Sequence, residues 1–148
     1  MDALNLSHLA GFLIRRAQQA HVAAWNSQVS TETTSVQFGV LNVLREYAGL
    51  SQRDLCDKLD LDRSTIGDLV VRLQGKGFVV RVRATDDRRR NVLDLTPLGH
   101  SEFRRLVNSV CDVDATLNQS LSQYEAVELR RLLIKVIDSV PTPSPVDH

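Results

Sequence analysis

The chain has 148 residues, 43% of them hydrophobic, and its 18 basic residues balance its 18 acidic residues. This length and composition predict one compact domain with a sizeable core, and they exclude disordered and collagen-like chains. Because the net charge is zero, the whole molecule has no strong attraction for polyanions, and a nucleic-acid contact requires locally concentrated positive charge.

Six helices are predicted, and most of their starts carry capping residues. They span residues 4–28, 35–47, 52–59, 63–75, 97–119 and 123–139. The capping-box spacing, or a close variant, recurs at three starts: Thr34 with Gln37, Ser51 with Asp54, and Ser122 with Glu125. Asp62 is expected to cap the fourth helix and Thr96, followed by Pro97, the fifth.

Two strands are predicted at 78–83 and 91–96, because β-branched and aromatic residues favour extended structure there. The intervening ATDDRRR (84–90) gives the resulting hairpin a loop with three consecutive arginines. Gly75 and Gly77 are expected to close the fourth helix and turn the chain into the hairpin. The proline-rich segment 141–148 is expected to be a flexible tail.

A helix pair followed by an arginine-tipped hairpin predicts a mainly α fold of α+β type, the winged helix-turn-helix. In such a fold one helix enters a DNA major groove while the hairpin reaches a neighbouring groove. On the helix from Arg63, an apolar stripe at helical spacing is expected to face the core: Ile66, Leu69, Val70 and Leu73. The opposite face carries the candidate base readers: Ser64, Thr65, Gly67, Asp68, Val71 and Arg72.

Positive charge is concentrated around these elements. Residues 63–90 hold eight basic and three acidic residues, and fifteen of the chain's 18 basic residues are arginines, whose planar fork suits phosphates and guanine edges. The further candidates for DNA contact are Arg63, Arg88, Arg89 and Arg90. Asp87 is expected to pair with Arg89 and stabilise the loop while another arginine enters the minor groove. The alternatives are a solvated arginine-rich hairpin and an ordinary amphipathic surface helix.

The order of elements and the segment DRRRNVLDLTPLG (87–99) resemble the MarR family of bacterial transcription regulators. The wing signature of that family is an Asp-x-Arg followed by Leu-Thr and a glycine, and Asp87, Arg89, Leu95, Thr96 and Gly99 match it. The resemblance implies a homodimer in which 1–33 and 97–140 form an intertwined helical dimerisation region, with 34–96 as the DNA-binding lobe. Such a dimer would bind double-stranded DNA at a pseudo-palindromic operator with half-sites about 10 base pairs apart.

The sequence supplies apolar faces for that dimer. Leu6 to Trp25 is apolar around most of its circumference, and a helix apolar on so many sides is expected to be buried by more than its own domain. The last two helices offer further apolar residues: Phe103, Leu106, Val110, Leu117, Leu129, Leu132, Leu133, Val136 and Ile137.

The first helix also resembles a MarR branch that responds to hydroxylated benzoates such as protocatechuate, in which an arginine and a histidine of that helix meet the ligand. Arg15 and His21 match, because a guanidinium pairs with a carboxylate and an imidazole hydrogen-bonds a phenol or carboxylate. The candidate ligand-binding residues for a small aromatic carboxylate effector are Arg15, Gln18, His21, Trp25 and Phe38. The alternative is that Arg15 is solvated and His21 is a core or interface histidine.

Other functions receive less support. The four histidines are scattered without metal-ligand spacing, and no phosphate-binding glycine motif occurs, so we expect no enzyme, metal or cofactor. Cys56 and Cys111 lack CxxC spacing, and the first helix lacks the cysteine of the peroxide-sensing branch; oxidant sensing by either thiol is the alternative. No signal segment or apolar run of ~20 residues occurs, which predicts a cytoplasmic protein without membrane contact.

These observations predict a dimeric, ligand-responsive repressor, with repression implied by the resemblance alone. The competing prediction is a winged helix that binds another protein, because fold does not fix function. The arginines around the loop favour phosphate over an apolar protein anchor.

Overall fold

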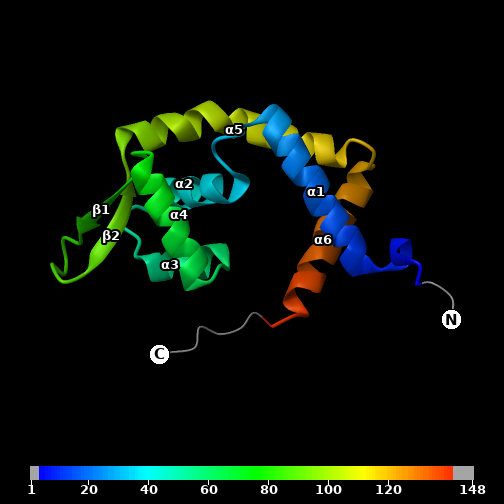
Figure 1. The fold of residues 1–148 in the computed structure, drawn as a ribbon, viewed down its shortest axis with the longest axis horizontal. Coiled ribbons are helices and arrows are strands. Elements are labelled where there is room, and N and C mark those ends of the chain that lie inside the picture. The colour runs from blue at the N-terminus through cyan, green and yellow to red at the C-terminus, as the bar shows by residue number, and fades with distance from the viewer. Residues whose placement is uncertain (1–3, 142–148) are drawn as a thin grey trace. The chain divides into compact units, whose positions relative to one another are not determined.

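The computed structural model describes residues 4–141 and is mostly helical (Figure 1). In chain order the elements are η1 (Leu6–His8), α1 (Ala10–Gln28), α2 (Ser35–Glu46), α3 (Gln52–Leu59), α4 (Arg63–Gly75), β1 (Val79–Arg83), β2 (Asn91–Leu95), α5 (Pro97–Asn118) and α6 (Gln123–Asp138). The predicted flexible tail, apart from the exposed Pro141, lies outside the described residues.

The chain forms two compact units, where composition predicts one. The first combines residues 1–32 with 108–140, and the second is built on 33–107. The division falls within α5 rather than at its start, because the first part of this helix joins the core of the second unit. Phe103 stacks on Phe38 of α2 with ring centroids 5.2 Å apart and planes 11° apart. Phe103 and Leu106 are therefore buried within one chain, and their prediction as dimer-face residues is wrong.

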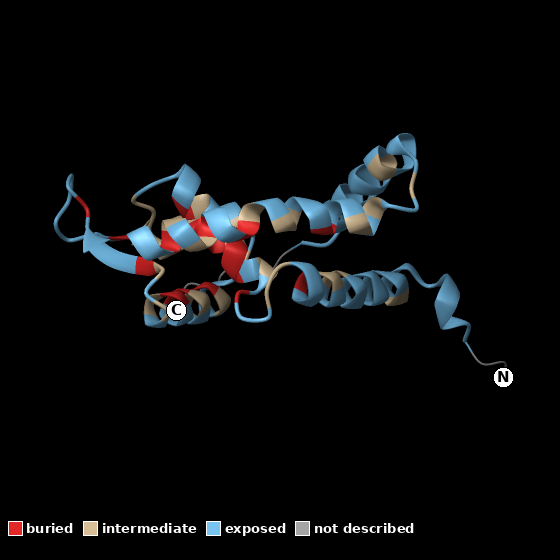
Figure 2. Ribbon diagram, turned by 90° about the horizontal axis from the view of Figure 1, so that it is seen from above, coloured by how far each residue is buried: buried red, intermediate tan, exposed pale blue. Residues whose placement is uncertain are grey.

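The core of the 33–107 unit is made by α2, α3, α4, the hairpin and the first part of α5, and Figure 2 shows its buried residues in red. Helix α3 packs on α4 and α2, and α2 also contacts β2. The side chains that are essentially inaccessible include Val40, Leu41, Leu55, Ile66, Val70, Leu73 and Leu93. This packing makes α3 and α4 a helix-turn-helix with the hairpin extending from it.

The hairpin is antiparallel, in a register that pairs Val79 with Leu95 and Arg83 with Asn91. It is anchored to the loop after α2 by two hydrogen bonds. The N–H of Leu93 donates to the carbonyl of Leu50 at 2.7 Å, and the N–H of Gly49 donates to Oδ1 of Asp94 at 2.8 Å. The base of the wing is thus fixed to the helical core.

The predicted caps are confirmed at α2, α3 and α6, where both bonds of each capping box form. The first helix differs from its prediction because it begins at Ala10 and not at residue 4. The Asn5 side chain accepts from the N–H of Ser7 and caps the short η1, and Leu9 is extended. A separate turn therefore precedes α1.

The unit of 1–32 and 108–140 buries little of its apolar surface (Figure 2). Among its described residues, Trp25 and Val113 are the buried hydrophobic side chains, and α6 has none. Seven apolar side chains of α6 are between 41% and 60% exposed: Val127, Leu129, Leu132, Leu133, Ile134, Val136 and Ile137. This unit leaves an apolar helix face without cover in the single chain.

Candidate nucleic-acid interface and effector residues

The start of α4 is held by Asp62. Its Oδ1 accepts from the N–H of Thr65 and its Oδ2 accepts from the Thr65 hydroxyl, both at 2.8 Å. These bonds lower the pKa of the Asp62 carboxyl, with the backbone bond contributing most. Because the hydroxyl proton of Thr65 is used within the chain, the oxygen lone pairs are what this residue offers to an external donor.

The two faces of α4 separate as the apolar spacing predicts. Ile66, Val70 and Leu73 are fully buried, while Leu69 is half-buried. On the opposite face Ser64, Asp68, Val71 and Arg72 are exposed, and Thr65 and Gly67 are half-buried. The fully buried stripe fixes the rotation of α4, so its outward face presents hydroxyl, guanidinium and apolar groups together.

The wing loop is organised by short-range bonds. A guanidinium nitrogen of Arg83 donates to the carbonyl of Arg88 at 2.7 Å, and Arg90 pairs with Asp86 at 3.3 Å, which lowers the pKa of Asp86. Asp87 accepts from the backbone N–H of Arg89 at 2.9 Å. The expected Asp87–Arg89 pairing therefore uses the Arg89 backbone and not its guanidinium, which leaves that side chain exposed.

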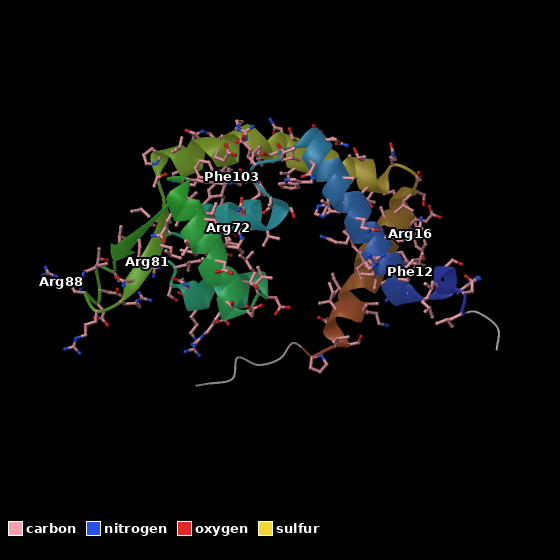
Figure 3. All side chains as sticks on the ribbon, in the orientation of Figure 1. Phe12, Arg16, Arg72, Arg81, Arg88 and Phe103 are labelled. Atoms are coloured by element: carbon pink, nitrogen blue, oxygen red, sulfur yellow. The ribbon has the colours of Figure 1, made fainter. Side chains whose placement is uncertain are left out.

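The loop thereby separates its arginines into two groups. Arg83 and Arg90 hold the loop, whereas Arg88 and Arg89 extend from it, and Figure 3 shows Arg88 at the tip of the hairpin. Of the candidate DNA-contacting residues, Arg63 lies at the first position of α4, adjacent to Ser64 and Thr65. The α4 face and the loop arginines belong to one compact unit.

Four of the five candidate effector residues lie on α1. Arg15 and Gln18 are exposed, and the Arg15 guanidinium lies 5.6 Å from the ring centroid of Phe12. The rings of His21 and Trp25 meet edge to face at 6.1 Å, and Trp25 is only 5% exposed. The fifth candidate, Phe38, belongs to the other unit, where it is stacked on Phe103.

Both cysteines are free thiols. Cys56 is half-buried, and burial raises its pKa, while Cys111 is exposed on α5. Within the described part of the chain, no group of three or more His, Cys, Asp or Glu residues is arranged to hold a metal ion.

One pair of residues near α4 is absent from the predicted site. Arg81 of β1 donates to Oε1 of Gln52, the first residue of α3, at 2.6 Å. The sequence places these residues 29 positions apart, and Arg81 enters the prediction only as part of the local charge. Only tertiary structure reveals the pair.

A recognition helix with one fully buried stripe, a preceding packed helix and an arginine-tipped hairpin together define a winged helix-turn-helix protein. The MarR family model matches residues 32–90. The HTH-type transcriptional repressor NicR of Pseudomonas putida is 30% identical over 136 residues, which cover 91% of this chain and 86% of NicR.

Solved structures agree. The PcaV transcriptional regulator of Streptomyces coelicolor, in complex with its natural ligand, is 40% identical, with a TM-score of 0.88 over 93% of this chain and 98% of PcaV. Bordetella bronchiseptica BpsR, whose DNA binding is regulated by 6-hydroxynicotinic acid, is 28% identical, with a TM-score of 0.85 over 93% of this chain and 99% of BpsR.

The chain belongs to the MarR family. It is a DNA-binding transcriptional regulator with a winged-helix fold, and not an enzyme. Among residues 4–141, no helix combines the length and the apolarity that crossing a membrane requires.

Proposed function

We propose that this protein is a homodimeric repressor that binds a pseudo-palindromic operator and is released by a small aromatic carboxylic acid. The observation that carries the DNA-binding part is the outward face of α4, oriented by its buried stripe and accompanied by the exposed Arg88 and Arg89 of the wing. Because chromosomal DNA is the target, we also propose a cytoplasmic location.

Different parts of this surface serve different tasks. Ser64, Thr65 and Arg72 are the proposed base readers, and the methyl groups of Val71, which is 66% exposed, suit the methyl group of a thymine. Contacts to phosphates or to the minor groove, which follow the shape and charge of the duplex more than the identity of each base, are proposed for Arg63, Arg88, Arg89 and Arg90. The Asp68 carboxylate can accept a hydrogen bond from the N4 amino group of a cytosine.

The dimer is supported by the uncovered apolar side of the 1–32 and 108–140 unit. A helix whose seven Val, Leu and Ile side chains are all at least 41% exposed in one chain is expected to be covered by another surface. A second copy of the same helices is the occupant proposed here, with 34–96 as the lobe that each copy places on one half-site. Two-fold symmetry then makes the operator pseudo-palindromic.

The effector is supported by the chemistry of α1 and by two similar proteins. PcaV is crystallised with its natural ligand, and BpsR responds to 6-hydroxynicotinic acid, an aromatic acid. Arg15 supplies a guanidinium for a carboxylate, Gln18 and His21 supply hydrogen bonds, and the buried Trp25 contacts the His21 ring edge to face. We assign Arg15, Gln18, His21 and Trp25 of α1 to the effector site.

Fluorescence anisotropy on a duplex from the region upstream of the gene tests the proposal. We expect binding that prefers this duplex to a random one, falls steeply with salt, and is reversed by one member of a panel of benzoates, hydroxybenzoates and 6-hydroxynicotinate. Selective binding that no acid reverses would remove the effector and keep the repressor. Salt-insensitive binding without sequence preference would contradict the operator as well.

Calorimetry on two adjacent arginines tests the effector residues. Arg15→Ala should weaken binding of the active acid about tenfold or more, because a charge-assisted hydrogen bond to the carboxylate is lost. Arg16→Ala removes the same charge from the neighbouring position of α1 and is the matched control. Equal affinities for both variants and the wild type would overturn the assignment of Arg15.

A further inference from the structure

The side chain of Gln52 connects the wing strand to the helix-turn-helix. Arg81 lies on β1, and its guanidinium donates to Oε1 of Gln52 at 2.6 Å. Gln52 is the first residue of α3, the helix that packs on α4. A single hydrogen bond therefore ties an exposed guanidinium of the wing to the helix that supports the reading helix.

The same Gln52 amide also lies against the reading face of α4. A Cβ added at Gly67 would lie 3.8 Å from Nε2 of Gln52, which is ordinary van der Waals contact. The amide therefore lies one van der Waals contact away from the side-chain position of Gly67. Gln52 is thus positioned by α4 on one side and bonded to Arg81 on the other.

Two further arginines border this pair in a pocket, and the carboxylates of Asp57 and Asp62 lie near Cys56 of the same pocket. Gln52 lines an open pocket of about 230 Å³ together with Arg53, Cys56 and Arg63. Arg53 and Arg63 stand at the starts of α3 and α4, and Figure 3 shows Arg81 on the neighbouring hairpin. The guanidinium groups at this edge can donate hydrogen bonds to an anion.

The acceptor on Gln52 is neutral, and this distinguishes Arg81 from Arg90. Arg90 pairs with the Asp86 carboxylate, so a negative group already neighbours its guanidinium. Within the described residues no carboxylate pairs with Arg81, so the amide oxygen holds its guanidinium in place while the full positive charge and the remaining N–H donors stay available. A preorganised cation of this kind loses less side-chain entropy when it binds an anion.

We propose that Arg81 contacts a phosphate of the DNA backbone between the groove read by α4 and the groove reached by the wing, and that Gln52 is its positioning residue. Helix and hairpin enter neighbouring grooves in this fold, so the backbone between them passes the strand that carries Arg81. The inference rests on the DNA binding of the chain and adds two residues to its interface.

Salt-dependent anisotropy on a labelled duplex of random sequence tests the role of Arg81. Arg81→Ala should weaken binding about tenfold and lower the slope of log affinity against log salt by about 0.9, because one phosphate contact is lost. Arg130→Ala, which removes an exposed arginine from α6, is the matched charge control and should leave the slope unchanged. An unchanged slope and affinity for Arg81→Ala would overturn the proposal.

A double-mutant cycle separates positioning from independent contact. Gln52→Leu keeps the bulk and removes the acceptor; it should weaken binding about threefold to tenfold with the salt slope retained, because Arg81 keeps its charge and loses its preorganisation. Adding Gln52→Leu to Arg81→Ala should cause no further loss. The same loss in both backgrounds would mean that Gln52 contacts DNA by itself and would overturn its positioning role.

The melting temperature of each variant in the cycle shows whether a loss of DNA affinity comes from a loss of folded protein. Gln52 is half-buried and Arg81 exposed, so melting temperatures close to that of the wild type are expected. A loss of DNA affinity that only follows a loss of folded protein would refute positioning. Failure of the wild-type protein to bind any duplex would instead refute DNA binding itself, so the two failures are distinguishable.

Discussion

Gly99, in the first turn of α5, packs against the backbone carbonyl of Phe78, where the chain enters β1. A Cβ added at Gly99 would overlap that carbonyl oxygen. Thr96, three residues earlier, reinforces the same junction: its hydroxyl donates to the carbonyl of Gly77 at 2.5 Å and accepts from the N–H of Gly99 at 3.0 Å. The Leu-Thr and glycine of the wing signature are thus the residues that join the hairpin to α5.

Gly99→Ala should therefore destabilise the protein. The added methyl group would force the start of α5 away from the carbonyl of Phe78, and overpacking of this kind costs about 1–3 kcal/mol. Urea unfolding followed by circular dichroism measures the free energy of unfolding. An alanine variant as stable as the wild type would contradict the close contact.

Gly67→Ala is the matched glycine replacement, and we expect it to stabilise the protein where Gly99→Ala destabilises it. Gly67 lies within α4, and a Cβ there would lie 3.8 Å from Nε2 of Gln52, an ordinary van der Waals contact. Alanine in a helix interior should raise the free energy of unfolding by about 0.5–1 kcal/mol relative to glycine. The new methyl group would also lie on the reading face, so we expect altered operator preference in anisotropy measurements. A Gly67→Ala protein less stable than the wild type would show that α4 has no room for the methyl group.

Glu102 should make stability depend on pH. Two hydrogen bonds from Arg105, at 2.8 and 2.9 Å, and one from the Thr33 hydroxyl, at 2.8 Å, lower the pKa of Glu102 below its ordinary value of 4.5, although partial burial opposes them. Because the folded pKa lies below the unfolded pKa, the stabilisation is complete above about pH 4.5 and is lost as the pH falls through the folded value.

Glu102→Gln measures this contribution. It should cost about 1–3 kcal/mol at neutral pH, because hydrogen bonds to a charged carboxylate are replaced by weaker ones to an amide. The difference in unfolding free energy from the wild type should shrink as the pH is lowered below about 4.5. A difference that is constant across that range would show that the ionisation of Glu102 does not stabilise the fold.

Asp87 should affect DNA binding through the shape of the wing loop. Its carboxylate accepts from the backbone N–H of Arg89, so Asp87→Ala frees the loop, whereas Asp87→Asn retains an acceptor oxygen. We expect Asp87→Ala to weaken binding to specific and random duplexes alike and Asp87→Asn to retain most of the affinity, as measured by anisotropy. Because removal of a negative charge by itself strengthens DNA binding, tighter binding by Asp87→Ala would contradict the ordering role.

The sequence predicts the reading helix better than the wing. The bounds of α3 and α4 agree with prediction because local signals mark their ends: Ser51 and Asp62 at the starts, and Gly75 at the end of α4. The side-chain partners in the wing are not predictable in the same way. Arg83, Arg88, Arg89 and Arg90 are the same residue type within eight positions, and only the loop geometry decides which of them bonds inward.

Two further differences have the same physical origin. A nearly continuous apolar pattern predicts one helix from residue 4, and it conceals the Asn5 cap that closes η1 before α1 begins. Phe103 has the spacing of a dimer-face residue, yet Phe38 of α2 covers it within the same chain. Periodicity identifies an apolar face, but it does not identify which surface buries that face, and the Gln52–Arg81 bond depends on tertiary structure in the same way.

The apolar stripe of α6 provides the test of the proposed dimer. Leu129, Leu132, Leu133 and Val136 recur at helical spacing and are 41–45% exposed in the single chain. Leu133→Asp places a charge in the middle of this stripe. If a second copy covers it, burying the unpaired charge costs several kcal/mol, and the variant should dissociate to a monomer at concentrations where the wild type is a dimer.

Sedimentation velocity measures the oligomeric state, and Arg130→Ala, an exposed change on the same helix outside the stripe, is the control. The monomeric variant should also bind a full operator far more weakly than the wild type and approach the affinity of the wild type for a single half-site, because the two half-sites are no longer engaged together. A Leu133→Asp protein that remains dimeric would mean that another surface forms the dimer, and α6 would then require a different partner.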